Sequence, residues 1–264
     1  MAATPQEAKT FYDARIEKAL EACQEAGYKP LFMPELAEAR INGIAPWNQW
    51  LTTPSIRATG RTKQGNAVVV YGHVPNYLSN PANIKEAKRG LVNYAACIPQ
   101  EEFQRLVDLE DKKTVWVVDH DVVKRSTSGK TSIEKALEHP QVIPFLGSEE
   151  RAQRYLQAHA RAYNTKSIGV WHRDDLNNES PLARFLFLGY GGNFLVGGND
   201  LDGSGRFLGV RDASAAGAEK ISQAPTLDEK DLPLLERIMD FSKTYIPEQR
   251  HAEYEREARH RFMQ

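Results

Sequence analysis

Short apolar runs recur along the chain and predict the strands of a sheet. Continuous apolar stretches of this kind are typical of strands that are buried on both faces. "AVVVYGHV" is one such run, and "SIGVWH" and "RFLFLG" are two others. The predicted strands cover residues 67–74, 114–121, 167–172, 184–189, 194–196 and 206–211. The run "VIPFLG" (142–147) predicts a further short extended piece.

Apolar residues at helical spacing lie between these runs, and capping residues mark where the helices begin. Asn80 followed by Pro81 predicts a helix that ends at Gly90, and Ser148 predicts one that continues to Tyr163. A further helix is expected over 100–110. Thr131 and Glu134 have the spacing of a capping box, which predicts a short helix before Pro140.

The N-terminal stretch gives the most regular helical pattern. Thr4, Pro5 and Glu7 have the order of a cap, a first-turn proline and a capping-box acid. Gly27 supplies the stop. The apolar residues that fall on one helical face are Ala8, Phe11, Tyr12, Ile16, Ala19, Leu20 and Cys23.

The order of these elements predicts an α/β or α+β fold with one mixed sheet flanked by helices. Strands alternate with helices through 67–172, which favours parallel pairing, whereas the closely spaced strands after 184 favour antiparallel Gly-rich hairpins. No long polar linker interrupts the chain. We therefore expect a single globular domain over 1–264, with a helical tail at 228–264.

Composition narrows the class of protein. The 264 residues are 41% hydrophobic and 26% charged with a formal net charge of -1, which is typical of a folded soluble protein and gives no basic field for nucleic acid. Two cysteines cannot build a Cys-rich zinc site, and they favour a reducing, cytoplasmic location. No apolar stretch approaches the roughly 20 residues that span a bilayer, so no membrane partner is expected.

The segment "VWVVDHDVV" (115–123) places Asp119, His120 and Asp121 inside an apolar run. In a strand, residues i and i+2 share a face, so Asp119 and Asp121 could hold one hard cation, Mg²⁺ or Mn²⁺. The arrangement resembles the apolar run and Asp-x-Asp of metal-dependent nucleotidyltransferases and primase-like polymerases, over three residues and without assigning a family. The alternative is that the strand ends near Val118 and the acids cap the next turn.

A second polar group, in "GVWHRDDL" (169–176), follows another predicted strand. His172, Asp174 and Asp175 would join Asp119 and Asp121 if the two strands were neighbours in a parallel sheet, because ligands bind at the carboxyl edge of such sheets. These three residues are the candidate catalytic groups, and His172 is a candidate ligand or general acid/base. The alternative is an Asp-Asp turn beside a surface histidine.

Two glycine-rich motifs do not meet their patterns. "STSGKTS" (126–132) lacks the first glycine of a phosphate-binding loop, because position 124 is lysine. Lys124, Arg125 and Lys130 remain candidate phosphate-binding residues. "GGNDLDGSGRF" (197–207) has glycines where an EF-hand needs acids, so turn chemistry explains it better.

Two functional hypotheses from different classes stay open. One is a metal-dependent hydrolase or phosphoryl-transfer enzyme that acts on a small phosphorylated or nucleotide substrate. The other is a non-catalytic assembly or binding protein that uses the Gly-rich hairpins and the C-terminal helix. Nucleic acid is a further candidate partner, because the basic 57–63 segment lies near Trp47 and Trp50, residue types suited to base stacking. The sequence does not predict an oligomeric state.

Overall fold

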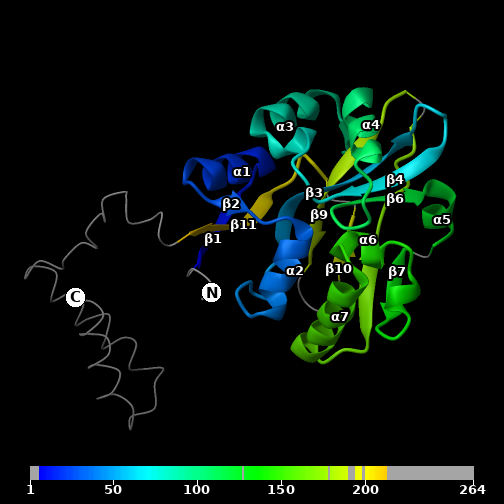
Figure 1. The fold of residues 1–264 in the computed structure, drawn as a ribbon. Coiled ribbons are helices and arrows are strands. Elements are labelled where there is room, and N and C mark those ends of the chain that lie inside the picture. Colours follow the sequence, from blue (N-terminus) through cyan, green and yellow to red (C-terminus); the bar gives the residue numbers. More distant parts are fainter. Residues whose placement is uncertain (1–5, 127, 178, 190–193, 198–199, 213–264) are drawn as a thin grey trace, which may run out of the picture. The chain divides into compact units, whose positions relative to one another are not determined.

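The computed structural model describes residues 6–126, 128–177, 179–189, 194–197 and 200–212. These residues form an α+β fold, in which seven α-helices flank a mixed sheet of eleven strands (Figure 1). The predicted fold class is therefore confirmed. The predicted helical tail at 228–264 lies outside the described residues, as do parts of the Gly-rich segments at 191–193 and 198–199.

The bounds of the elements follow chain order. The strands are β1 (Gln6–Asp13), β2 (Lys29–Pro30), β3 (Leu51–Arg61), β4 (Ala67–Gly72), β5 (Ala96–Cys97), β6 (Val115–Asp119), β7 (Gly129–Ser132), β8 (Ser167–Trp171), β9 (Leu182–Leu188), β10 (Phe194–Val196) and β11 (Gly205–Asp212). The helices are α1 (Ile16–Glu25), α2 (Met33–Ile41), α3 (Pro81–Ala87), α4 (Gln100–Asp108), α5 (His120–Arg125), α6 (Val142–Leu146) and α7 (Glu149–Tyr163). Short 3₁₀ turns lie at Tyr77–Ser79, Lys88–Gly90 and Ala136–Glu138.

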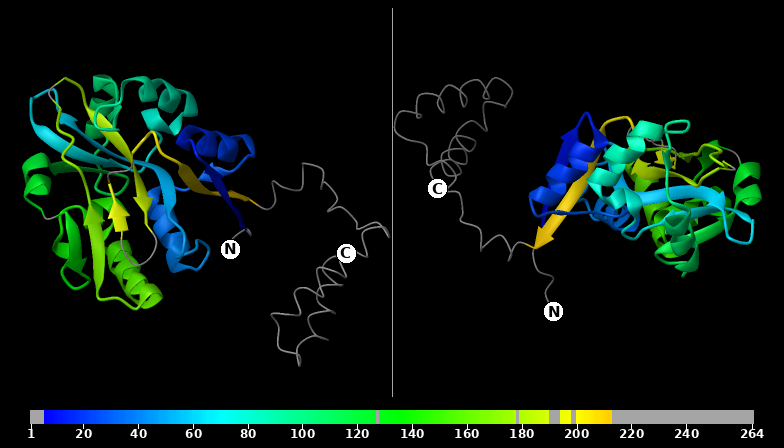
Figure 2. Two further views of the ribbon diagram at one scale, coloured as in Figure 1. Left: turned by 180° about the vertical axis from the view of Figure 1, so that it is seen from behind. Right: turned by 90° about the horizontal axis from the view of Figure 1, so that it is seen from above.

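Strands β3 and β9 pair antiparallel and form the centre of the sheet. The main path runs β1-β11-β3-β9-β10-β8-β7, and β4 and β6 extend the sheet from the far half of β3. Among the pairs whose register is described, β10 with β8 and β11 with β3 are parallel. Figure 2 shows these strands from behind and from above.

An irregularity in β3 divides the sheet into two halves. The register with β9 shifts between Thr52 and Ile56, so the intervening residues leave the ladder. Pro54 falls in this gap, where its missing N–H costs no ladder bond. The displaced Thr53 hydroxyl donates to the Leu186 carbonyl at 2.9 Å, and the Ser55 hydroxyl accepts the Met33 N–H at 2.8 Å.

The continuous apolar runs of the sequence arise because helices cover both faces of the sheet. In β4, Val69 and Tyr71 belong to a core shared with α2, α6 and α7, whereas Val68 and Val70 belong to a core shared with α1, α3 and α4. Successive side chains of a strand point to opposite faces. A strand buried on both sides therefore needs apolar residues at nearly every position.

Several predicted elements are confirmed together with their caps. The Asn80 side chain accepts the Ala82 N–H, and α3 follows from Pro81. Ser148 accepts the Arg151 N–H at the start of α7. Helix α4 and strands β4, β8, β9, β10 and β11 also lie where the pattern predicts them.

The predicted N-terminal helix is wrong in its first half. Residues 6–13 form β1, which pairs with β11, and the helix begins only at Ile16. The apolar positions Phe11 and Tyr12 fit either structure. Pairing with the edge of the sheet outweighs the weak local preference for a helix.

Two shorter predictions are also wrong. "VIPFL" was expected to be extended but forms helix α6, because a short apolar run does not distinguish a strand from one buried helical turn. Thr131 does not cap a helix. It lies in β7, which pairs with β8, and a 3₁₀ turn at Ala136–Glu138 replaces the predicted helix.

The strands at 114–121 and 167–172, whose adjacency was the condition for a shared metal site, are not neighbours in the sheet. Strand β6 pairs with β4 on one half of the sheet, whereas β8 pairs with β7 and β10 on the other. Strand β6 also ends at Asp119, and His120 begins helix α5.

Within the described part of the chain, no helix combines the length and hydrophobicity needed to cross a bilayer.

We expect Gly147→Ala to destabilise the fold by about 2 kcal/mol or more. Gly147 has a φ of 83°, and an added Cβ would lie 2.7 Å from Pro34 Cγ, so the variant suffers both backbone strain and overlap. Chemical denaturation measures the loss. Gly90→Ala is the matched control, because nothing lies within 4 Å of the added Cβ; equal losses in the two variants would contradict this account.

Candidate functional site

Polar side chains of the segment that follows β8 contact side chains of α5 and the side chain of Asp200. His120 Nε2 lies 2.8 Å from Asp174 Oδ1, and Lys124 Nζ lies 3.7 Å from Asp174 Oδ2. Arg173 Nη1 lies 3.0 Å from Asp200 Oδ1. We call this region the 171–174 surface; it consists of Trp171, His172, Arg173, Asp174, Asp121, Lys124 and Asp200.

The backbone under this surface is held by the sheet. Strand β8 lies between β7 and β10, and the Gly197 N–H donates to the Trp171 carbonyl at 2.9 Å. Ser128 Oγ accepts the His172 N–H at 3.2 Å. The exposed side chains therefore stand on a fixed main chain, and Trp171 is 40% exposed.

A buried ion cluster fixes the residue that follows the surface. Asp175 receives two bonds from Arg184, at 2.8 Å from Nε and 3.0 Å from Nη2, and Arg57 Nη1 lies 3.5 Å from the same carboxylate. The side chains of Asp175, Arg184 and Arg57 are 2%, 0% and 1% exposed. Arg184 Nη1 also lies 3.1 Å from Asp200 Oδ1. The two arginines therefore face two carboxylates, and their positive charges are offset.

A chain of hydrogen bonds leads from the core to His172. The Tyr71 hydroxyl donates to Gln141 Oε1, and Gln141 Nε2 lies 2.6 Å from His172 Nδ1. If Gln141 donates through Nε2, His172 carries its own proton on Nε2. Burial, followed by the Arg57 guanidinium and His139, lowers the pKa of His172 to about 4. His172 is therefore neutral at pH 7, which suits it to donate a hydrogen bond.

The other predicted residues take structural or separate positions. Asp119 caps α5 by accepting the N–H groups of Asp121 and Val122, at 2.8 and 3.2 Å. The Asp121 side chain is 78% exposed. Lys124 reaches Asp174, whereas Arg125 ends α5 and Lys130 is exposed on β7.

The proposed metal couple is not formed by Asp119 and Asp121. Because Asp121 lies on a helix and not on the strand, the two carboxylates do not share a strand face. Across the described residues, no group of three or more His, Cys, Asp or Glu side chains could hold a metal ion. The alternative expectation, that the acids cap the next turn, describes Asp119 correctly.

Sequence reasoning missed the residues beneath the surface. Arg184 stands inside the otherwise apolar strand β9, and a cation there needs a buried carboxylate. Arg57 lies in β3, among threonines and a serine, and gives a weaker signal. That signal points to some acid but does not identify Asp175. Gln141 had no signal of its own, and His120 stood out only as a polar residue in an apolar run, because the partners of both are distant in the chain.

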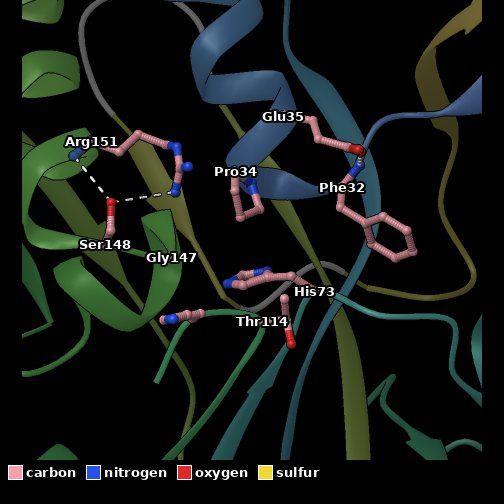
Figure 3. A pocket seen from close by; sticks show the side chains of 9 residues that line it. Phe32, Pro34, Glu35, His73, Thr114, Gly147, Ser148 and Arg151 are labelled. Atoms are coloured by element: carbon pink, nitrogen blue, oxygen red, sulfur yellow. Dashed lines mark hydrogen bonds between the residues drawn. The ribbon is translucent and has the colours of Figure 1, made fainter. Parts of the chain in front are cut away.

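A pocket of about 480 Å³ lies elsewhere, between the start of α2 and the α6–α7 junction (Figure 3). Its lining includes Phe32, Pro34, Thr114 and Arg151, with His73 at its base. Ser55 Oγ lies 3.0 Å from His73 Nδ1, and His73 Nε2 lies 2.9 Å from the Pro144 carbonyl. Because a carbonyl only accepts, Nε2 carries the proton and both nitrogens of the neutral ring are satisfied.

Comparison with known proteins gives one informative match. A solved structure described as "Accommodation of massive sequence variation in Nanoarchaeota by the C-type lectin fold" is 52% identical to this chain, with a TM-score of 0.73. The match covers 78% of this chain and 98% of that one. No protein-family model matches the chain, and no curated protein does.

This match corrects the enzymatic hypothesis. A metal-dependent hydrolase or phosphoryl-transfer enzyme was predicted, but the similar structure has the C-type lectin fold. That prediction rested on four acids: Asp119 caps α5, Asp121 is exposed, Asp174 pairs with His120, and Asp175 pairs with two buried arginines. The prediction is therefore wrong, and the non-catalytic alternative is the better supported one.

We expect Asp175→Asn to destabilise the protein by about 3–5 kcal/mol, the usual loss when one partner of a buried ion pair is removed. The change leaves Arg57 without a carboxylate among the described residues and weakens the hold on Arg184. Denaturant unfolding measures the loss. Asp121→Asn, at an exposed carboxylate, should leave stability unchanged; an equally small effect of Asp175→Asn would show that the cluster is dispensable.

Stability should decline as the pH falls from 6.5 to 4. Burial lowers the pKa of His73 from 6.5 to about 4, so the unfolded chain takes up a proton first and the contribution of neutral His73 is lost over this range. The loss is at most about 3 kcal/mol, from 1.36 kcal/mol per pKa unit. Unfolding free energies measured across this range should show a flatter slope in His73→Gln.

His172→Gln provides the comparison for this pH series. The pKa of His172 is also lowered to about 4, but its side chain is only partly buried and solvent screens it. Its removal should therefore flatten the slope less than His73→Gln does. An unchanged slope in His73→Gln would mean that this histidine does not control the acid sensitivity.

Proposed function

This chain belongs to the family of the Nanoarchaeota protein that has the C-type lectin fold, and we propose that it is a non-catalytic binding protein. Its ligand contacts the 171–174 surface. The observation that carries the proposal is that the exposed side chains of this surface are distinct from the buried residues that hold its main chain. Exposed polar and aromatic side chains form the outer layer, and a buried ion cluster holds the main chain beneath them.

Such a separation suits a surface whose side chains can change. Exposed side chains away from caps and buried networks usually alter stability by less than about 0.5 kcal/mol when they are replaced. The matched Nanoarchaeota structure is described as accommodating massive sequence variation. We extend this property to the present chain, with Trp171, Arg173, Lys124 and Asp121 as the positions that determine which ligand is bound.

The residue types of the surface suit recognition of a partly polar ligand. Trp171 offers an aromatic face, Arg173 and Lys124 offer cations, and Asp174 offers a carboxylate. His172 adds a neutral donor whose orientation is held by Gln141. Aromatic residues and arginine contribute strongly to binding energy at interfaces.

The earlier expectation that Gly-rich hairpins bind a partner is retained in part. Asp200, one described residue of the Gly-rich stretch, contacts both Arg173 and Arg184. The C-terminal helix of that expectation lies outside the described residues. The proposal therefore rests on the surface alone.

We expect the triple variant Trp171→Ala, Arg173→Ala, Lys124→Ala to stay folded and to lose binding by at least about tenfold, because about 1.4 kcal/mol corresponds to a factor of ten. The labelled full chain would be applied to arrays of defined glycans and short peptides, and each bound probe would be titrated against the variant. Thermal unfolding checks the fold.

The control is a triple variant at exposed residues of the same types, Tyr12→Ala, Arg154→Ala and Lys29→Ala. Lys29 and Lys124 have equally exposed side chains, at 62%. The control should bind as the parent does. Equal loss in both variants, or none in the first, would remove the 171–174 surface from the proposal.

A further inference from the structure

We propose that the open edge of β6 is a second binding site, independent of the 171–174 surface, which takes an extended peptide segment of a partner protein as an added strand. Among the described strands, β6 pairs with β4 alone, so its other edge has no neighbour. An unpaired edge next to an apolar groove is the arrangement by which proteins bind extended peptides.

The register shows which peptide groups face this open edge. The His73 N–H donates to the Thr114 carbonyl at 2.8 Å, so residues 73 and 114 form a hydrogen-bonded pair of the antiparallel ladder. Such pairs alternate along a ladder, which makes Tyr71–Trp116 and Val69–Val118 the next ones. The N–H and C=O of Val115, Val117 and Asp119 therefore point away from β4.

At the start of this edge, the main-chain groups of Val115 already have hydrogen-bond partners. Val115 donates its N–H to Asp111 Oδ1 at 3.0 Å, and its carbonyl accepts the N–H groups of Asp111 and Lys112 at 3.2 and 3.0 Å. At the other end, Asp119 turns the chain into α5. The available groups are the Val117 N–H and C=O and the Asp119 N–H, which offer two or three main-chain bonds.

A groove of about 470 Å³ runs beside this edge. Its apolar lining includes Trp116 and Val118 from the strand and Leu137, Pro140 and Ile143 from the facing segment. Its charged residues include Glu138, Glu149 and Lys112, which leave an excess of one negative charge. The edge supplies main-chain bonds, and the groove supplies a place for alternate side chains.

These features define the occupant. Only an extended main chain offers an N–H and a C=O together at the spacing of the Val117 pair, and apolar residues at alternate positions would fill the groove. A basic residue on that peptide complements Glu138 and Glu149. A second copy of β6 fits less well, because both of its ends are closed and Trp116 and Val118 already pack against its own core.

The test is selection from a phage-displayed library of random linear eight-residue peptides against the full chain. We expect selected peptides with alternating apolar residues and a basic residue. Their affinity should fall at least tenfold in Val117→Pro, which removes the outward N–H and leaves the pairing with β4 intact. Val117→Thr keeps the N–H and should bind normally, as should Trp171→Ala, which tests the 171–174 surface separately.

Amide hydrogen exchange on the unmodified chain gives a second measurement that does not depend on how Val117→Pro folds. Free Val117 should exchange faster than Trp116 and Val118, and a selected peptide should slow the exchange of Val117. The proposal is overturned if no peptide is selected, if Val117→Pro binds as the parent does, or if Trp171→Ala abolishes binding. Protection of Val117 that rises with protein concentration would also overturn it, in favour of a second copy.

Discussion

The attachment of Asp175 to Arg184 and Arg57 is the constraint on which the candidate surface depends. Arg57 belongs to β3 and Arg184 to β9, the two central strands, so one carboxylate ties both strands to the segment that leaves β8. Buried charges of this kind are costly unless they are paired. The pairing therefore fixes where Asp175 lies, and the four residues before it are carried to the surface.

This arrangement explains why a polar cluster can resemble a catalytic centre without being one. His120 and Lys124 both lie within contact distance of Asp174, as the parts of an active site do. Yet Asp175 is occupied by two guanidinium groups, and Asp119 by two backbone N–H groups. The carboxylates of Asp175 and Asp119 are therefore used within the fold, and the exposed side chains remain for contact with a ligand.

The sequence predicted the fold class because local signals and burial agree over most elements. Asn80 and Ser148 cap their helices as expected, and the run at 67–74 is apolar because both of its faces are covered. The prediction failed where distant pairing decides the structure, as in β1 and β7. Likewise, the polar residues at 119–121 and 172–175 were identified, but their partners Arg57, Arg184 and Gln141 are set by tertiary packing that no local pattern encodes.

The irregularity at Thr53–Ser55 has a consequence for the mechanics of the sheet. One half of β3 leads toward β4 and β6, and the other leads toward β11, while β9 runs alongside both. A strain applied at either half is therefore transmitted through the same two strands to the other. Because such an irregularity bends a strand and changes its local twist, the two halves of the sheet can differ in twist while β9 keeps them joined.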